Sequence, residues 1–295
     1  MINQEDIKDE KKAKEEEQRK RSFNGLSASE WASLSKNVWN DVSSPRARKH
    51  LDHGATFPEK LANRLILMYT KKKDWVLDPF LGTGTTLEAC RNTQRNGIGI
   101  ELNERFIPYA EEITKQKTIT QDMQLKVIHD DCRNLLKHVS KESIQLMVTS
   151  PPYANFIHKS IADREQTHKT SLIRLENKST VNPYGDKKED FGNLEYEEFL
   201  KETKELMKKL FVVTKIGGYN VWVIKDYRDT KNKVPYISFH SDLAKVGEEI
   251  GFKFHDLIVW DQTGQRKLVL LGYPSIFYTN QNCSFLVVFR KPNGY

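Results

Sequence analysis

The sequence has few cysteines and no long apolar run. Its three cysteines, Cys90, Cys132 and Cys283, are far apart and show no C-x-x-C spacing, which argues against a disulfide framework and against a zinc site. No apolar stretch is long enough to cross a bilayer, and the charged N-terminus is unlike a signal peptide. We therefore expect a cytoplasmic protein with reduced cysteines and no metal ion.

The glycine-rich segment DPFLGTGTT, residues 78–86, lacks the marks of two common nucleotide-binding turns. A P-loop needs a Gly-Lys-Ser/Thr sequence, and a dinucleotide fingerprint needs a third glycine where Leu87 stands. Gly82 and Gly84 would still let the backbone approach a ligand closely at the end of a strand. The Asp78 carboxylate favours an amine-bearing or cationic ligand over pyrophosphate. S-adenosylmethionine, with its ammonium and sulfonium groups, fits that charge.

Short apolar segments alternate with amphipathic ones along most of the chain. Strands are expected at 75–80, 97–101, 125–129, 144–150, 217–226, 252–260 and 284–291, with helices at 57–70, 103–116, 195–214 and 238–251 and a glycine turn that runs into a helix at 81–93. This order predicts an α/β fold with a doubly wound, mostly parallel sheet and an antiparallel hairpin of the last two strands at one edge. Residues 1–25 form a charged arm or helix, and residues 26–295 form one domain with a polar insertion at about 154–193.

Acidic residues follow successive strands of this predicted sheet. Glu101 stands 23 positions after Asp78, where a carboxylate can accept both hydroxyls of a ribose. Asp131 follows the third strand and could accept the amino group of an adenine, with Cys132 behind it. Each acid alone is more often a helix cap or a solvated side chain. Together at the ends of neighbouring strands, they indicate an adenosine site.

The segment TSPPY, Thr149 to Tyr153, follows the fourth strand. Two consecutive prolines remove two backbone donors and fix φ, so the segment can be neither helix nor central strand. It is expected to be a rigid, extended loop. Such a loop presents the Ser150 hydroxyl and the Pro151 carbonyl as acceptors beside the Tyr153 ring, which suits a flat molecule that carries an amine.

The segments FPEKLANRLI, VLDPFLGTGTTLEAC, GIGIELNERF, HDDCRN and TSPPY, taken together, resemble the amino-methylating DNA methyltransferases, which modify the exocyclic nitrogen of cytosine or adenine. The resemblance covers roughly residues 26–291. It implies a Rossmann-like methyltransferase sheet and a site-specific enzyme of a restriction-modification or orphan modification system. The implied substrate is a flipped base in double-stranded DNA, and the implied cofactor is S-adenosylmethionine.

The resemblance also assigns site residues. The implied catalytic residues are Ser150, Pro151, Pro152 and Tyr153. The implied cofactor-binding residues are Thr56, Phe57, Pro58, Asp78, Pro79, Phe80, Gly82, Thr83, Gly84, Thr85, Thr86, Glu101, Leu102, Asp131, Cys132 and Thr149. A serine at position 150 is typical of the cytosine-N4 enzymes, whereas the adenine-N6 enzymes usually carry Asp or Asn there.

Three alternatives stay open beside a cytosine-N4 enzyme. One is an adenine-N6 enzyme. Another is an RNA base amino-methyltransferase, which would usually carry an RNA-binding module for which the chain has no spare length. The third is a nucleic-acid-binding module with a degenerate cofactor fold. A C5-cytosine enzyme is excluded, because it needs a nucleophilic cysteine that generally follows a proline, and none of the three cysteines does so.

Basic residues in two loops are the candidates for DNA contact, and the net charge of +7 agrees weakly with a polyanionic partner. The candidate residues are Arg46 and Arg48 in one loop and Lys159, Arg164, Lys169 and Arg174 in the insertion. A solvated loop is the alternative for the insertion, and the loop 261–282 is the next candidate for recognition. Segment 36–58 either packs beside the active site or covers a sheet edge. A cognate restriction endonuclease is a further possible partner, and the oligomeric state is not predicted.

Overall fold

The computed structural model describes residues 4–43, 57–115, 123–152, 190–229, 232–265 and 277–293. Its longer helices are α1 (Gln4–Arg21), α2 (Ala28–Leu34), α4 (Glu59–Tyr69), α5 (Thr85–Thr93), α6 (Ile107–Lys115), α9 (Tyr196–Val213) and α10 (Phe239–Ile250). Shorter helical turns are η1 (Cys132–Asn134), α7 (Leu135–His138), η2 (Phe191–Asn193) and η3 (Thr263–Gln265). The strands are β1 (Val38–Trp39), β2 (Trp75–Asp78), β3 (Asn96–Glu101), β4 (Leu125–His129), β5 (Ile144–Thr149), β6 (Thr214–Ile224), β7 (Tyr227–Asp229), β8 (Val234–Ile237), β9 (Lys253–Asp261) and β10 (Cys283–Arg290).

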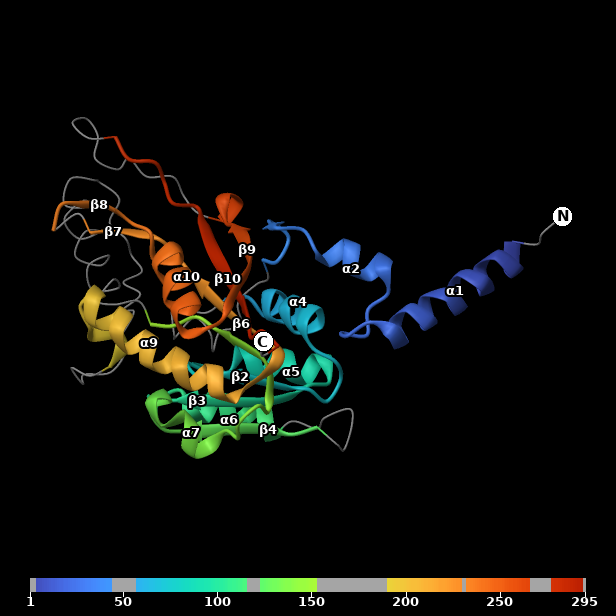
Figure 1. Ribbon diagram of the computed structural model, residues 1–295, viewed down its shortest axis with the longest axis horizontal. Helices are drawn as coiled ribbons and strands as arrows, with labels where there is room; N and C mark the ends of the chain where they lie inside the picture. The colour runs from blue at the N-terminus through green and yellow to red at the C-terminus, as the bar shows by residue number, and fades with distance from the viewer. Residues whose placement is uncertain are drawn as a thin grey trace.

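Among the described residues, eight strands form one sheet in the order β1-β9-β10-β6-β5-β2-β3-β4 (Figure 1). The pairs β2 with β3, β3 with β4, β2 with β5, and β5 with β6 are parallel. β10 pairs antiparallel with both β6 and β9. The predicted α/β fold is therefore confirmed, together with the antiparallel hairpin of the last two strands. The outermost position beyond that hairpin is taken by the short strand β1.

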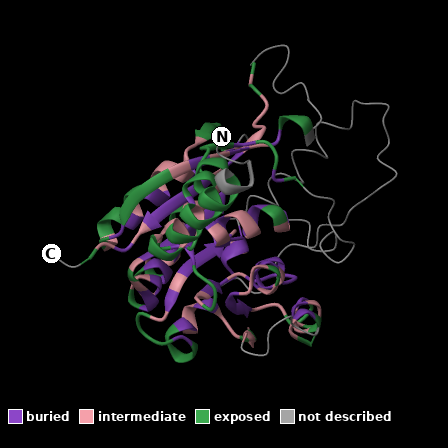
Figure 2. Cartoon of the chain, turned by 90° about the vertical axis from the view of Figure 1, so that its right-hand side faces the viewer, coloured by how far each residue is buried: buried purple, intermediate pink, exposed green. Residues whose placement is uncertain are grey.

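Each central strand buries side chains on both faces, as a doubly wound sheet requires. Val76 and Leu77, adjacent on β2, belong to two different clusters of buried residues. One cluster includes residues of α7, α9 and α10, and the other includes residues of α4 and α5. Figure 2 shows the buried strands between helices whose outer faces are exposed.

The helix α4 forms where its apolar spacing predicted it. Leu61, Leu65 and Met68 are spaced along one face and are buried. Pro58 precedes the first helical residue, where its missing N–H costs nothing because that group has no partner in the helix. The helix α6 likewise accommodates Pro108 in its first turn.

Segment 36–58 is described up to residue 43 and from residue 57. In its described part, Val38 and Trp39 form β1, which pairs in parallel with β9. The Trp39 side chain is fully buried. This part of the segment therefore covers the edge of the sheet, which was one of the two expectations for it.

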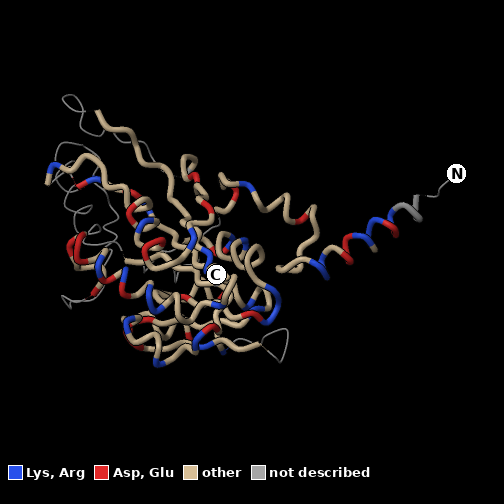
Figure 3. The backbone as a smooth tube through the Cα atoms, in the orientation of Figure 1, with Lys and Arg blue, Asp and Glu red and all other residues tan. Residues whose placement is uncertain are grey.

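The helix α1 extends away from the sheet (Figure 1), and both signs of charge alternate along it (Figure 3). Its end is fastened to α2, because the Arg19 guanidinium donates to both carboxylate oxygens of Glu30 at 3.1 Å. In the described part of the chain, no helix combines the length and the apolarity that crossing a membrane requires.

Candidate active site

The carboxylate of Asp78, the last residue of β2, is tied into the protein by three hydrogen bonds. Its Oδ1 atom accepts from the Phe80 backbone N–H at 3.0 Å and from Thr149 Oγ1 at 2.7 Å. Its Oδ2 atom accepts from Thr86 Oγ1 at 2.5 Å. Burial raises the pKa of this carboxyl to about 6, although the hydrogen bonds from Thr86 and Thr149 lower it. Asp78 thus holds the turn after β2, the start of α5 and the end of β5 together.

The glycine turn between β2 and α5 is packed against the protein itself. Gly84 has a φ of +95°, which favours glycine. A Cβ atom at Gly84 would lie 2.6 Å from Ile113 Cδ1 and 3.2 Å from Ala110 Cα, both on α6. At Gly84, the close approach that the sequence suggested for a ligand is therefore an approach to a neighbouring helix.

Glu101, the last residue of β3, is joined to the same turn. Its Oε2 atom accepts from the Gly82 backbone N–H at 2.6 Å, and its Oε1 atom accepts from the Asn103 backbone N–H at 2.7 Å. Burial raises the pKa of Glu101 to about 7, although both backbone hydrogen bonds lower it. A carboxylate in this state can accept hydrogen bonds from hydroxyl groups of a ligand, because each of its oxygens has more than one acceptor position.

Asp131 lies beyond the end of β4 and forms a network with Arg133. Its Oδ1 atom accepts from the Arg133 backbone N–H at 2.8 Å, and its Oδ2 atom accepts from Arg133 Nη1 at 2.8 Å. Arg133 Nε donates to Glu202 on α9 at 2.7 Å. The guanidinium also lies over the Phe191 ring, 4.7 Å from its centroid. The network fixes the Asp131 carboxylate through Arg133, whose guanidinium also contacts the Phe191 ring.

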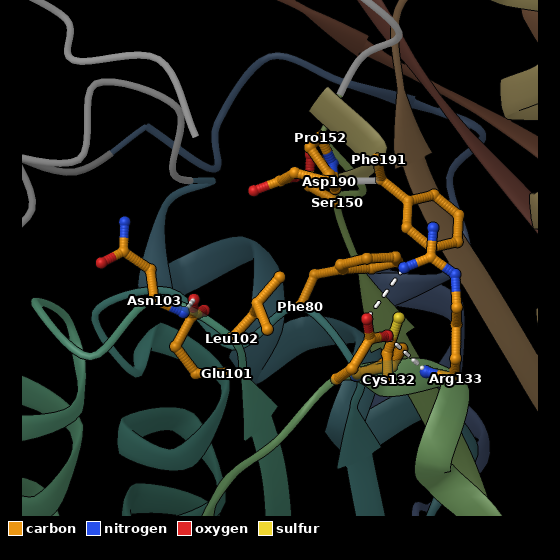
Figure 4. Close-up of a pocket in the computed structure, with 12 residues that line it drawn as sticks. Phe80, Glu101, Leu102, Asn103, Cys132, Arg133, Ser150, Pro152, Asp190 and Phe191 are labelled. Atoms are coloured by element: carbon orange, nitrogen blue, oxygen red, sulfur yellow. Dashed lines mark hydrogen bonds and ion pairs between the residues drawn. The ribbon is translucent and has the colours of Figure 1, made fainter. Parts of the chain in front are cut away.

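These groups surround one cleft at the carboxyl ends of the parallel strands (Figure 4). The open space in the cleft, which includes space open to solvent, is about 560 Å³. The residues that line it are Pro79, Phe80, Glu101, Leu102, Asn103, Asp131, Cys132, Arg133, Ser150, Pro152, Asp190 and Phe191. The Phe80 and Phe191 rings meet edge to face, with centroids 5.2 Å apart. The cleft therefore combines acidic groups with aromatic surface.

The structure brings eight of the sequence-predicted residues into this lining: Pro79, Phe80, Glu101, Leu102, Asp131, Cys132, Ser150 and Pro152. The other described candidates are absent from the lining: Phe57, Pro58, Asp78, Gly82, Thr83, Gly84, Thr85, Thr86, Thr149 and Pro151. Asp78 in particular is only 2% exposed, so its carboxylate does not face the cleft, where it was expected to contact a ligand ammonium. Outside the described residues lie Thr56, Tyr153, Arg46, Arg48, Lys159, Arg164, Lys169 and Arg174.

Sequence reasoning missed four lining residues: Asn103, Arg133, Asp190 and Phe191. Asp190 and Phe191 were assigned to the polar insertion, although an acid followed by Phe and Gly just before an amphipathic helix could have suggested a structured turn. Asp190 Oδ1 accepts from the Gly192 backbone N–H at 3.0 Å and begins η2. Burial raises the pKa of Asp190. Figure 4 shows Asp190 and Glu101 on different walls of the cleft.

Two of the cysteines, Cys90 and Cys132, are buried as expected, whereas Cys283 is only partly buried. Within the described ranges, no group of three or more His, Cys, Asp or Glu side chains has the arrangement of a metal site.

Residues 1–112 match the model of a protein family described as DNA methylase, the N6/N4 methyltransferase family. This match includes the glycine turn and Glu101 but ends before Asp131 and Ser150. The chain is 35% identical over 127 residues to the Type II methyltransferase M.BglI of Bacillus subtilis, which is 42% of this chain and 36% of that protein. It is 39% identical over 95 residues to the Type II methyltransferase M.MjaI of Methanocaldococcus jannaschii, which is 31% of each protein. The chain thus spans about a third of the length of these relatives.

Among solved structures, an S-adenosylmethionine-dependent methyltransferase from Methanosarcina mazei aligns with 78% of this chain and 98% of its own. Its sequence identity is 15% and its TM-score is 0.44, a likeness too distant to assign a function. The family match and the curated relatives are the stronger evidence. Over residues 1–112 the chain is similar to the N6/N4 family of DNA methylases, and in part it is similar to Type II methyltransferases.

Proposed function

We propose that the chain is a site-specific DNA methyltransferase that transfers a methyl group from S-adenosylmethionine to the exocyclic N4 amine of a flipped cytosine. The main support is one arrangement. Ser150 and Pro152 of the loop predicted to be catalytic line the same cleft as Glu101 and Asp131, the acids predicted to bind adenosine. Residues predicted to bind the cofactor and residues predicted to bind the target amine therefore line one cleft.

The residues of the cleft fit the cofactor. The Glu101 carboxylate can accept the ribose hydroxyls, and Phe80 and Leu102 offer apolar surface to an adenine ring. Asp131 lines the same cleft, is held in place by Arg133 and can accept the adenine amino group.

The cofactor is a cation at its methionine end, and two acids support that end in different ways. When bound, S-adenosylmethionine supplies an electrophilic methyl group on a positively charged sulfur. Asp190 lines the cleft and can attract the ammonium and sulfonium charges. Asp78 acts indirectly, without touching the cofactor. Its hydrogen bonds with Phe80, Thr86 and Thr149 hold the glycine turn and the start of the catalytic loop in fixed positions relative to each other.

The loop after β5 orients the target amine. An exocyclic amine is conjugated with its ring, so its lone pair is a poor nucleophile. The Ser150 hydroxyl and the Pro151 carbonyl can each accept one N–H of the amine and turn the lone pair toward the methyl group. The amine loses its extra proton to water afterwards. A base inside the duplex is out of reach of such a loop, so the target has to leave the stack, and stacking on Tyr153 remains a prediction.

Double-stranded DNA is the proposed substrate, with the basic side chains at positions 46, 48, 159, 164, 169 and 174 as predicted contacts. The relatives are Type II methyltransferases, which supports a function in site-specific modification. A cognate restriction endonuclease is proposed as the functional partner. Cytosine is proposed over adenine on the serine at position 150 alone.

Expression of the chain in a host without DNA methylation, followed by sequencing that detects N4-methylcytosine and N6-methyladenine, tests the proposal. N4-methylcytosine at one recurring sequence is the expected result. N6-methyladenine at such a sequence would correct the base and keep the enzyme class. Genomic DNA without either base, from cells that contain the folded protein, would refute the proposal, and so would methylation of RNA alone.

A further inference from the structure

A small antiparallel ribbon rises from the catalytic edge of the sheet. β6 ends at Ile224, and the chain then forms β7, a turn and β8 before it enters α10. β5 and β6 are parallel, with Thr149 opposite Trp222, so the Ser150 loop and the base of the ribbon leave the sheet at the same edge. Figure 1 shows β7 and β8 side by side beyond this edge. The sequence predicted that the strand before the ribbon ends near Tyr227, and it gave no sign of β7 or β8.

The ribbon is fixed to the body of the protein by Asp226. This carboxylate is 2% exposed and accepts from Tyr236 Oη at 2.7 Å, from the His240 backbone N–H at 3.0 Å and from His240 Nδ1 at 2.7 Å. The His240 ring in turn stacks on Phe285 of β10, with centroids 4.5 Å apart. Asp226 thus joins β8 to the first turn of α10, so the ribbon has a defined position relative to the cleft.

The ribbon and the segment before β10 share a surface of exposed rings and positive charge. Tyr236 on β8 is 48% exposed and Phe277 is 76% exposed. The Arg228 guanidinium lies over two rings, 6.0 Å from the centroid of Tyr236 and 5.0 Å from that of Tyr278. Lys233 is exposed at the turn. We call Arg228, Lys233, Tyr236, Phe277 and Tyr278 the ribbon surface.

The charge of this surface is positive toward solvent, because the nearby acids are used internally. Asp226 is bonded as described above. Asp229 is 5% exposed and accepts from the Asn232 backbone and side chain at 3.2 and 2.8 Å. The Arg228 side chain therefore lies beside the exposed Tyr236 ring and Lys233 is exposed at the turn, with no solvent-facing acid among the described residues of the ribbon.

Exposed aromatic rings next to cations are the combination that binds nucleic-acid strands. The rings stack on bases and the cations neutralise phosphates. A protein partner would accept the rings as well, but it would have to supply acidic groups for Arg228 and Lys233. A DNA strand supplies both bases and phosphates, and the proposed substrate brings DNA to this edge.

We propose that the ribbon surface binds the DNA strand beside the extruded target base. Tyr236 and Phe277 contact the bases or sugars of that strand, and Arg228 and Lys233 contact its phosphates. This inference rests on the proposed function, because it needs a DNA substrate at the cleft. It adds the β7–β8 ribbon to the predicted DNA contacts, and it assigns a contact to Phe277 and Tyr278 of the loop 261–282, which the sequence indicated as the next candidate for recognition.

Two variants separate the two kinds of contact. Phe277→Ala removes an exposed ring, and Lys233→Glu reverses an exposed charge. Lys72→Glu is the matched control, because Lys72 is exposed between α4 and β2, at the opposite edge of the sheet. Binding of a short fluorescent DNA duplex is measured by anisotropy over a series of salt concentrations. Calorimetric titration with S-adenosylmethionine and thermal melting are measured on every variant.

Phe277→Ala should weaken DNA binding about fivefold or more, with the salt dependence unchanged, since stacking involves no counterion release. Lys233→Glu should weaken binding and lower the slope of log affinity against log salt by about one unit. Lys72→Glu should match the wild type, and all variants should bind S-adenosylmethionine and melt as the wild type does.

The inference would be overturned if both ribbon variants bound DNA with the affinity and the salt slope of the wild type. It would also be overturned if the variants bound RNA more weakly but bound DNA as the wild type does. A change in self-association with unchanged DNA binding would overturn it too, by showing that the surface joins two copies. A wild-type protein that binds no S-adenosylmethionine and methylates no DNA would instead refute the proposed function. The two failures are therefore distinguishable.

Discussion

Thr149 Oγ1 donates a hydrogen bond to Asp78 Oδ1 at 2.7 Å, and this bond joins the last residues of β5 and β2. Both residues are buried, with Thr149 fully covered. Thr149 immediately precedes Ser150. The bond therefore fixes the start of the loop that is proposed to hold the target amine relative to the glycine turn.

Replacement of Thr149 by valine tests this link. Thr149→Val keeps the shape but leaves a buried carboxylate with one donor fewer, which should lower the free energy of unfolding by about 1–3 kcal/mol. The loss should be greatest above pH 6, where Asp78 is ionised, because its pKa is raised to about 6. Urea unfolding at several pH values measures it. Thr149→Ser, which retains the hydroxyl, should restore most of the stability, and equal stability of the valine and serine variants would contradict the prediction.

Glu101 should make stability depend on pH. Burial raises the pKa of this carboxyl from 4.5 to about 7, so the folded protein keeps a proton that the unfolded chain loses. The stabilising contribution is complete below pH 4.5 and is lost as pH rises through about 7. Glu101→Gln does not titrate, so it should remove a fall on the order of 3 kcal/mol between these two pH values. Urea unfolding across this range compares the slopes, and identical slopes would show that Glu101 is not protonated in the folded protein.

Ser150→Ala should lower turnover by about tenfold, since one hydrogen bond to the target amine is lost while the Pro151 carbonyl remains. The affinity for S-adenosylmethionine should change little. Methyl incorporation into DNA gives the rate, and calorimetry gives the affinity. Ser140→Ala, at an exposed serine after α7, is the control. Turnover that matches this control would reduce Ser150 to an ordinary loop residue.

Asp190→Asn should weaken S-adenosylmethionine binding by about tenfold, because it removes a negative charge from the cleft wall. Asparagine can still accept the hydrogen bond from the Gly192 backbone N–H, so thermal stability should stay close to that of the wild type. Glu104→Gln removes a charge from an exposed position outside the cleft lining and is the matched control. Calorimetric titration measures the affinity of each variant for S-adenosylmethionine. Equal affinities for the two variants would show that Asp190 has no role in cofactor binding.

The regular parts of the fold were predictable because their patterns are local. The apolar runs around Val76, Met147 and Val221 identify buried strands without any knowledge of their neighbours. The spacing of Leu61, Leu65 and Met68 identifies one helix face. The acids at the ends of β3 and β4 were also predictable, since parallel strands bring their carboxyl ends to one edge.

The rest depended on contacts between distant segments. Nothing near Asp78 in the sequence reveals that Thr149, 71 positions away, would donate to its carboxylate and help enclose it. Arg133 faces the cleft because Glu202 on α9 and the Phe191 ring hold it there. The strands β7 and β8 have only 3 and 4 residues and include Pro235, so they give no periodic signal.

The reversed direction of β10 determines which loops reach the catalytic edge. In a wholly parallel sheet, only segments that follow strands are found at that edge. β10 runs against β6, with Phe285 opposite Ile224, so the segment that precedes β10 arrives where β6 ends. Residues 277–282 lead directly into that strand and are not the start of a helix. This stretch can change in length and composition without disturbing any strand-to-helix connection of the cofactor site, which makes it a place where relatives with the same chemistry can differ in the DNA they contact.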